Sequence, residues 1–244
     1  MDLVLGIDSS TTATKAIAWD RSGRSVAEGR ATLPLHDLGR GWMEQSVEDW
    51  WRSLGDALRD LFRTVDPARV VALAISNQRE TVGFLDENGA EVRPAILWLD
   101  ERCRPDIDLF SRKLPAERFR AITGKTPDPT PAVFSLHWLQ RCEPEHWRRT
   151  AHFVDVLGYL GWRLTGRRLT SWGSADPHGL MDLARFRYSP EILAVLGLGE
   201  DCCYPMVRPG TVMGEVGPEA ATATGLRTGT LQSARKAPVR RHSS

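Results

Sequence analysis

Three short polar segments of this sequence carry residue types that bind phosphate groups or sugar hydroxyls. In the first, residues 6–15, Asp8 leaves an apolar run and is followed by hydroxyl side chains over residues 9–12. A turn rich in hydroxyl and backbone N–H groups can hold phosphate oxygens, and an adjacent carboxylate can hold hydrated Mg²⁺. Asp, Ser and Thr are also ordinary residues of a hairpin turn, so this segment taken alone favours a plain turn.

The second segment, residues 76–81, reads Ser-Asn-Gln-Arg-Glu-Thr and lies between two apolar stretches. Loops at strand ends often form binding sites in α/β proteins. Arg79 offers a planar fork of donors and Glu80 an adjacent acceptor, a combination that suits the neighbouring hydroxyls of a polyol. The alternative is a solvated turn with a surface ion pair.

The third segment, residues 98–102, begins with Trp98 and contains Asp100. A tryptophan at a strand end offers a flat apolar wall to the C–H face of a sugar, and a carboxylate beside it can accept hydroxyl protons. The alternative interpretation puts Trp98 in the hydrophobic core and makes Asp100 the cap of the following helix.

Other motifs are incomplete. Gly124, Lys125 and Thr126 resemble the end of a P-loop, but Phe119 stands where the first glycine is required. The histidines show no H-E-x-x-H spacing, and no serine lies in G-x-S-x-G. The four cysteines include an adjacent pair but no C-x-x-C, so we expect neither a disulfide framework nor a zinc site, and a reducing cytoplasm fits best.

The hydrophobic periodicity predicts an α/β fold with a mixed sheet flanked by helices. Strands are expected over residues 3–7, 14–20, 25–32, 70–75, 82–85 and 94–98. Residues 47–62 have apolar side chains at helical spacing, with Ser46 as the expected N-cap. Residues 101–164 are expected to be mainly helical around a proline-rich loop at 123–131, and residues 190–196 form a short helix.

Composition excludes several classes of protein. The chain has 244 residues, of which 41% are hydrophobic and 26% charged, as in a soluble globular protein and unlike a disordered one. No apolar run reaches the roughly 18–20 residues of a membrane span, and the first residues do not resemble a signal peptide. Four basic residues lie beyond residue 231, and acidic residues outnumber basic ones in the rest of the chain, so we expect no nucleic-acid or membrane partner.

Taken together and in this order, the segments resemble the N-terminal half of the FGGY family of carbohydrate kinases. Residues 6–12 are similar to the family's first phosphate loop, and residues 41–45 resemble the stretch before its first long helix. Residues 77–81 are similar to the substrate loop of glycerol kinases, and residues 94–102 to a strand and loop of pentulose kinases. Residues 155–166 and 171–182 resemble two further family stretches, so the resemblance covers roughly residues 3–230.

The resemblance implies an actin-like, ribonuclease-H-like domain that closes with a second domain on Mg-ATP and a sugar or polyol. The second domain would supply the adenosine site, and a Gly-Gly-x-x-Asp segment the catalytic base. Asp8 would hold Mg²⁺ through water. The residues implied near phosphate and Mg²⁺ are Asp8, Ser10, Thr11, Thr12 and Lys15, and those near the substrate are Gln78, Arg79, Glu80, Trp98 and Asp100.

Two positions depart from the family pattern. Ser10 replaces the glycine that is common after the aspartate of the first loop, which stiffens that turn. Val133 stands where glycerol kinases place a tyrosine that faces the substrate. The second departure favours a pentulose such as xylulose over glycerol.

The expected domain covers residues 1–230, and residues 231–244 are expected to form a basic, disordered tail. No Gly-Gly-x-x-Asp occurs in the sequence, so we expect a truncated kinase that lacks its nucleotide-binding domain and is inactive alone. The alternative is a non-catalytic sugar-binding or interaction module, which forms a homo-oligomer or pairs with a second kinase domain through an exposed apolar face.

Overall fold

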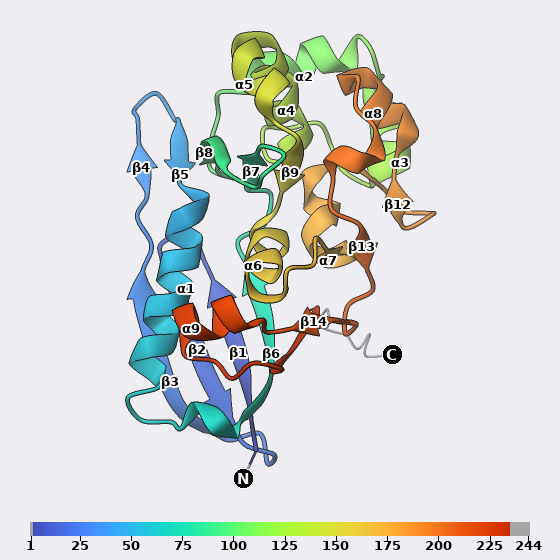
Figure 1. Ribbon diagram of the computed structural model, residues 1–244. Coiled ribbons are helices and arrows are strands. Elements are labelled where there is room, and N and C mark those ends of the chain that lie inside the picture. The colour runs from blue at the N-terminus through green and yellow to red at the C-terminus, as the bar shows by residue number, and fades with distance from the viewer. Residues whose placement is uncertain (1, 235–244) are drawn as a thin grey trace.

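A six-stranded mixed sheet forms the base of the molecule in the computed structural model, which describes residues 2–234 (Figure 1). Its strands follow the order β14-β15-β6-β1-β2-β3. Their bounds are β1 (Leu3–Ser9), β2 (Ala13–Trp19), β3 (Ser25–Thr32), β6 (Val70–Asn77), β14 (Val212–Glu215) and β15 (Leu231–Ala234). β1 pairs antiparallel with β2 and parallel with β6, so the sheet joins the expected meander to a parallel strand.

The residues of β1 alternate between the two faces of this sheet. Leu3, Leu5 and Ile7 are buried, whereas Val4 and Asp8 on the other face are exposed. The buried face packs against α1 (Val47–Leu61), α6 (Val156–Thr165) and α9 (Pro218–Thr224), which lie together over the strands in Figure 1. Alternate burial therefore leaves one face of the sheet in the core and the other accessible.

Helix α1 begins and packs as its sequence predicts. The hydroxyl of Ser46 accepts a hydrogen bond from the backbone N–H of Glu48, which confirms Ser46 as the N-cap. Trp50, Leu54 and Leu58 are completely buried against the large sheet. Burial of this apolar stripe, rather than intrinsic helix propensity, is the main source of stability for such a helix.

A second, five-stranded sheet carries its own hydrophobic core with a group of helices, shown above the large sheet in Figure 1. Its strands, in the order β4-β5-β8-β7-β9, are β4 (His36–Asp37), β5 (Met43–Gln45), β8 (Glu91–Ile96), β7 (Val82–Leu85) and β9 (His152–Val154). The helices around it are α2 (Arg104–Ser111), α3 (Ala116–Thr123), α4 (Ala132–Cys142), α5 (Pro144–Arg149) and α8 (Pro190–Leu196).

Short elements complete the fold. Two-stranded ladders join β10 (Thr170–Ser171) to β13 (Met206–Val207) and β11 (Met181–Asp182) to β12 (Arg187–Tyr188). One-turn helices are α7 (Trp172–Ala175), η1 (Pro67–Arg69), η2 (Asp176–His178) and η3 (Glu200–Cys202). In the described part of the chain, no helix is long and apolar enough to span a membrane.

The structure corrects two expected boundaries in the second sheet. The strand expected at residues 94–98 is β8, which begins at Glu91 and ends at Ile96. The stretch expected to be mainly helical is interrupted by β9, whose three residues pair with β7. A strand of three residues is too short to show a periodicity in the sequence. Its strand conformation depends on pairing with a partner that lies far away in the chain.

The expected tail also needs correction. Leu231–Ala234 are not a disordered extension but strand β15, which pairs parallel with β6 and antiparallel with β14. Gln232 and Ala234 are buried there. The strand was missed because Leu-Gln-Ser-Ala has little intrinsic strand preference, so pairing with β6 decides its conformation. Residues 235–244 of the expected tail lie outside the described residues.

Gly29 on β3 allows α1 to approach the sheet closely, which leads to a first prediction. A Cβ atom at Gly29 would lie 2.2 Å from the carbonyl oxygen of Ala57 and 2.4 Å from the backbone nitrogen of Leu61. We expect Gly29→Ala to lower the free energy of unfolding by about 1–3 kcal/mol, because the helix must move away from the sheet. Urea denaturation measures this change.

The matched control for this prediction is Gly173→Ala. A Cβ atom at Gly173 would meet no atom within 4 Å, and its backbone is not in the left-handed region. We expect this variant to unfold at the same urea concentration as the unmodified protein or at a slightly higher one. Equal midpoints for the Gly29 and Gly173 variants would contradict the close packing of α1 on β3.

Candidate functional site

The parallel pairing of β1 with β6 places two polar loops side by side. Asp8 is opposite Ser76, and Ser9 is opposite Asn77, so both strands end at the same edge of the sheet. The backbone N–H of Gln78 continues the pairing by donating to the carbonyl oxygen of Ser9 at 2.9 Å. The carboxyl ends of neighbouring parallel strands are where α/β folds commonly bind ligands.

A cavity of about 350 Å³ lies at this edge and brings together residues from all three polar segments. Its volume is in the range of small-molecule sites. The lining residues are Asp8, Ser10 and Thr11 from the first segment, Asn77, Gln78, Arg79 and Glu80 from the second, and Trp98 from the third. We call this cavity the loop pocket. Seven of the ten predicted site residues therefore line one cavity.

Trp98 is an exposed wall of the loop pocket rather than a core residue. Its side chain is 41% exposed, which excludes the alternative that it belongs to the hydrophobic core. The indole Nε1 donates to the hydroxyl of Thr11 at 3.0 Å, so the third segment is tied to the first across the cavity. The hydroxyl of Thr81 accepts the backbone N–H of Trp98 at 3.3 Å.

A pair of buried amides fixes the loops below the pocket. Gln78 Nε2 donates to Gln45 Oε1 at 2.8 Å, and Gln45 Nε2 donates to the carbonyl oxygen of Thr11 at 2.6 Å. The Oε1 atom of Gln78 accepts from the hydroxyl of Thr81 at 3.1 Å. The side chain of Gln78 thus already has protein partners, and its main contribution is to position the residues on either side of it.

Arg79 and Glu80 lie in a group of charges that the sequence did not bring together. Arg79 Nη2 lies 3.6 Å from Asp176 Oδ2, and Lys125 Nζ forms an ion pair with the other oxygen of Asp176. Burial raises the pKa of the half-buried Glu80 carboxyl, and the nearby charges of Arg79 and Lys125 oppose this rise. Lys125 stood in the rejected P-loop match, and nothing in the sequence pattern distinguished Asp176.

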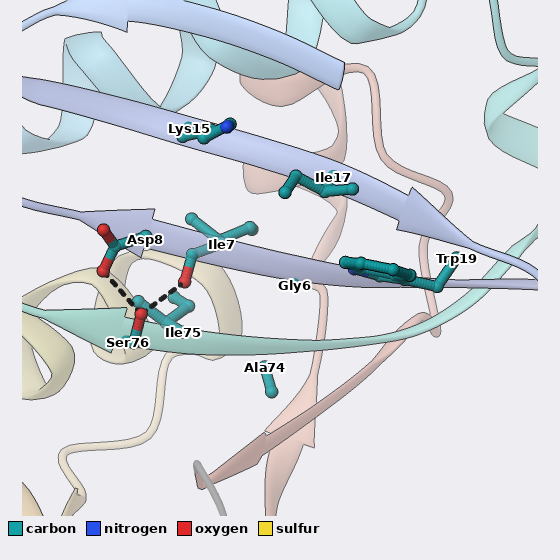
Figure 2. A pocket seen from close by; sticks show the side chains of 9 residues that line it. All are labelled: Gly6, Ile7, Asp8, Lys15, Ile17, Trp19, Ala74, Ile75 and Ser76. Atoms are coloured by element: carbon teal, nitrogen blue, oxygen red, sulfur yellow. Dashed lines mark hydrogen bonds between the residues drawn. The ribbon is translucent and has the colours of Figure 1, made fainter. Parts of the chain in front are cut away.

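Asp8 borders a second cavity, of about 270 Å³, on the accessible face of the large sheet (Figure 2). Asp8 Oδ1 accepts from the hydroxyl of Ser76 at 2.6 Å. Lys15 lines this second cavity rather than the loop pocket, opposite Asp8 on β2, and pairs with Glu28 at 2.8 Å. Thr12 is exposed and lines neither of these two cavities.

The donor set at Asp8 fits a hydrated magnesium ion. In the described residues, no group of three or more His, Cys, Asp or Glu side chains could hold a metal by itself. Mg²⁺ keeps several waters and often takes one carboxylate plus phosphate oxygens. The exposed carboxylate of Asp8, beside the hydroxyls of Ser10 and Thr11, has this chemistry.

Asp100 does not line the loop pocket. It is 1% exposed and forms a buried ion pair with Arg102 at 2.8 Å, and it also accepts the backbone N–H of Met43 at 2.6 Å. It is not a helix cap either, because α2 begins after Cys103 without a side-chain cap. Asp100 is therefore neither an acceptor in the loop pocket nor a helix cap in the free protein. Its buried contacts anchor the loop that carries Trp98.

The buried ion pair is part of a larger group of charges. Arg102 Nη1 lies 2.7 Å from Glu44 Oε1, and Glu44 also pairs with Arg93. The guanidinium of Arg102 lies 4.5 Å from the ring centre of Trp42, a favourable cation–π distance. Each of these charges has an opposite charge or an aromatic face as its neighbour, which compensates for the loss of water.

These observations define a class of protein: a mixed α/β fold with a cavity lined by polar loops at the ends of its parallel strands. The family model for the N-terminal domain of the FGGY family of carbohydrate kinases matches residues 3–234. The chain belongs to this family.

Named relatives support the assignment. The chain is 36% identical to the xylulose kinase of Streptomyces rubiginosus over 88% of this chain and 44% of that protein. It is 31% identical to the glycerol kinase of Gluconobacter oxydans over 81% of this chain and 40% of that protein. The crystal structure of xylulose kinase from Rhodospirillum rubrum superposes with a TM-score of 0.91 at 27% identity, covering 96% of this chain and 48% of that one.

The chain thus spans about half the length of the relatives it matches and corresponds to the N-terminal half of a carbohydrate kinase. The expected actin-like α/β fold and the resemblance to FGGY kinases are confirmed.

Glu80 provides a prediction about stability and pH. Since burial raises the pKa of Glu80 in the folded protein, its contribution to stability is present below the ordinary glutamate pKa and is lost as the pH rises through the raised value. We expect Glu80→Gln to unfold at a higher urea concentration than the unmodified protein at pH 7. The difference between the two proteins should shrink at pH 4.

A matched control is Glu28→Gln, which removes a carboxylate from the partly exposed pair with Lys15. Exposed pairs contribute little to stability, so its effect at pH 7 should be small. If Glu80→Gln instead unfolds at a lower urea concentration at pH 7, neighbouring groups fully compensate the Glu80 carboxylate for burial in the free protein. That result would contradict the prediction.

Proposed function

We propose that this chain supplies the sugar-binding pocket and the first phosphate-binding loop of an ATP-dependent carbohydrate kinase. The observation that carries the proposal is the convergence of all three polar segments on the loop pocket, in a chain of the FGGY family. A surface with unrelated turns would have no reason to bring Asp8, Glu80 and Trp98 to one cavity.

In this proposal the second and third segments bind the sugar. Trp98 offers an apolar face to the C–H groups of the sugar. Glu80 accepts a hydrogen bond from one hydroxyl, and Arg79 donates a hydrogen bond to a hydroxyl oxygen. The carboxylate of Glu80 is only partly satisfied by its neighbours in the free protein, as its raised pKa indicates. Burial deprives the carboxylate of hydrogen bonds to water. A substrate hydroxyl that donates to Glu80 would compensate for that loss.

The charges beside the pocket favour a neutral substrate. Arg79 and Lys125 both pair with Asp176, and the carboxylates of Glu80 and Asp128 lie close enough to interact electrically. A sugar acid would need an unpaired cation, which this group does not offer. We therefore propose a neutral polyhydroxy substrate, a pentulose such as xylulose in preference to an aldonate.

Val133 supports the same preference among neutral substrates. The resemblance to glycerol kinases placed a substrate-facing tyrosine at this position, but Val133 is fully buried in the second core. Its side chain does not line the loop pocket. A polyol as small as glycerol would lack that contact here, whereas a pentulose has more hydroxyls to bind elsewhere.

We propose that the first segment binds the phosphate groups of ATP. Asp8 would hold Mg²⁺ through water, with Ser10 and Thr11 donating to phosphate oxygens. When bound, Mg²⁺ supplies positive charge that offsets the phosphates. No structural argument supports Thr12 or Lys15 in this role, because neither lines the loop pocket and Lys15 is paired with Glu28.

The first test measures binding through Trp98. We expect D-xylulose to raise the melting temperature of the chain, since a ligand of the folded state alone stabilises it. Trp98→Ala should weaken this binding about tenfold, or about 1.4 kcal/mol, because it removes the apolar wall. Titration followed by calorimetry gives the affinity.

The matched control is Leu99→Ala, which truncates an adjacent side chain that is 39% exposed and does not line the pocket. Its affinity for D-xylulose should equal that of the unmodified protein. Absence of any stabilisation by xylulose, xylitol or glycerol, with and without Mg-ATP, would contradict the proposed function. Equal losses in the two variants would contradict the role of Trp98.

A second test concerns charge selection. Asp176→Asn leaves Arg79 and Lys125 without their shared carboxylate, so we expect D-xylonate to bind at least about tenfold more tightly than to the unmodified protein. Affinity for neutral xylitol should change much less. Calorimetric titration at low ionic strength measures both.

Asp56→Asn is the matched control, because it removes an exposed charge paired with Arg59 on α1. It should leave the ratio of xylonate to xylitol affinity unchanged. If the unmodified protein already binds xylonate as tightly as xylitol, the preference for neutral substrates is wrong, although sugar binding itself would stand.

A further inference from the structure

Two adjacent cysteines outside the loop pocket place their sulfur atoms close together. Cys202 is the last residue of η3, and the backbone of Cys203 forms an isolated parallel β-bridge with Phe153 of β9. Their Sγ atoms lie 3.6 Å apart, and both thiols are free and buried. The backbone is held by η3 on one side and by the β-bridge to β9 on the other, so the fold fixes the two Cα positions from which the thiols extend.

The spacing suits one bridging atom better than a disulfide. The described chain has no cis peptide bond, so the two Cα atoms are about 3.8 Å apart, below the roughly 4.4–6.8 Å of ordinary disulfides. Two bonds of about 2.3 Å from sulfur to a soft atom leave the sulfurs about 3.3 Å apart at a right angle and about 3.8 Å apart at a tetrahedral angle. The observed 3.6 Å lies between these values.

A cavity beside Cys203 has room for a substituent on the bridging atom. It has a volume of about 420 Å³, and its walls include the apolar and aromatic side chains of Phe186, Tyr188 and Met206. Its charged lining residues are Glu200, Asp201 and Arg187, so two acidic side chains face one basic side chain and a neutral substituent is favoured over an anionic one. Figure 1 shows this segment between α8 and β13.

The number of donors distinguishes between soft atoms. A structural zinc ion takes four protein ligands, and the described residues contain no group of three or more His, Cys, Asp or Glu that could hold a metal. A trivalent arsenical with one organic substituent needs just two sulfurs, because its third bond goes to carbon. Its neutral substituent also matches the apolar walls.

We propose that Cys202 and Cys203 form a bidentate thiol site for a monosubstituted trivalent arsenical. In the reaction, two As–O bonds of the dihydroxy form break and two As–S bonds form. Each leaving hydroxide takes one thiol proton, so two waters are released and no oxidation occurs. The substituent remains on arsenic and occupies the adjacent cavity.

The hydrogen bonds of the pair prepare it for this reaction. Cys202 Sγ donates to the carbonyl oxygen of Gly199 at 2.9 Å, which leaves the thiol of Cys203 to donate to Cys202. This hydrogen bond from Cys203 lowers the pKa of Cys202 and raises that of Cys203. Cys202 therefore becomes the first thiolate, and the second bond then forms within the same molecule.

The test uses phenylarsine oxide and intact-mass measurement on the full chain. We expect one arsenical per chain, retained in excess glutathione and removed by 2,3-dimercaptopropanol. Because the second bond is intramolecular, the adduct should survive glutathione roughly 10²–10⁴-fold longer than an adduct on one thiol. Cys202→Ser and Cys203→Ser should each lose this retention.

Cys142→Ser is the matched control, since Cys142 is an exposed single thiol. It should retain the adduct like the unmodified protein. Rapid removal of the arsenical from the unmodified protein by glutathione would overturn the proposal whether or not the serine variants fold. Retention by Cys203→Ser, with an unchanged circular dichroism spectrum, would do the same. The site shares no lining residue with the loop pocket, so neither result bears on sugar binding.

Discussion

The parallel pairing of β1 with β6 is the constraint on which the site depends. Ser9 and Asn77 are neighbours across these strands although 68 positions separate them in the numbering. Their pairing brings the carboxylate of Asp8 within hydrogen-bond distance of Ser76 and opens the two following loops at one sheet edge. A shift of one residue in this register would turn the side chains of one strand to the opposite face and separate the loops.

Buried polar groups convert that placement into a defined pocket. Gln45 connects the first loop, the second loop and the buried indole of Trp50 through its single amide. The ion group of Asp100, Arg102 and Glu44 does the same for the loop of Trp98. Such groups are costly to bury unless they are paired, so each arrangement tolerates few alternatives. The exposed residues of the pocket therefore rest on a rigid base.

The site also shows a conflict between stability and binding. Glu80 is half buried with a raised pKa and a positive φ of 62°, two features that disfavour the free protein. Strained or poorly solvated side chains of this kind concentrate at binding sites, where a ligand supplies the missing partners. Arg79 and Lys125 limit the cost, because their positive charges balance the carboxylate and oppose the rise in its pKa. The same balance restricts which ligands the pocket can accept.

Much of the fold followed from local pattern. A short, mostly apolar run predicted β1, and the polar turns that follow it predicted the meander of β2 and β3. The apolar stripe with Ser46 in front predicted α1. Strands β9 and β15 were missed, because each is short and is a strand by virtue of its partners, β7 in one case and β6 and β14 in the other. Asp100 was placed in the pocket because its neighbour Trp98 belongs there, and sequence proximity does not reveal which side chain turns inward.

By itself, the sequence determined the α/β class, the family resemblance and the three polar segments, because short-range periodicity and residue chemistry are local properties. Only the tertiary structure decided that Lys15 faces a different cavity, that Asp100 is buried, and that Asp176 and Lys125 join Arg79. Those facts depend on contacts between residues far apart in the chain. Such contacts are set by strand register and core packing, which no single segment encodes.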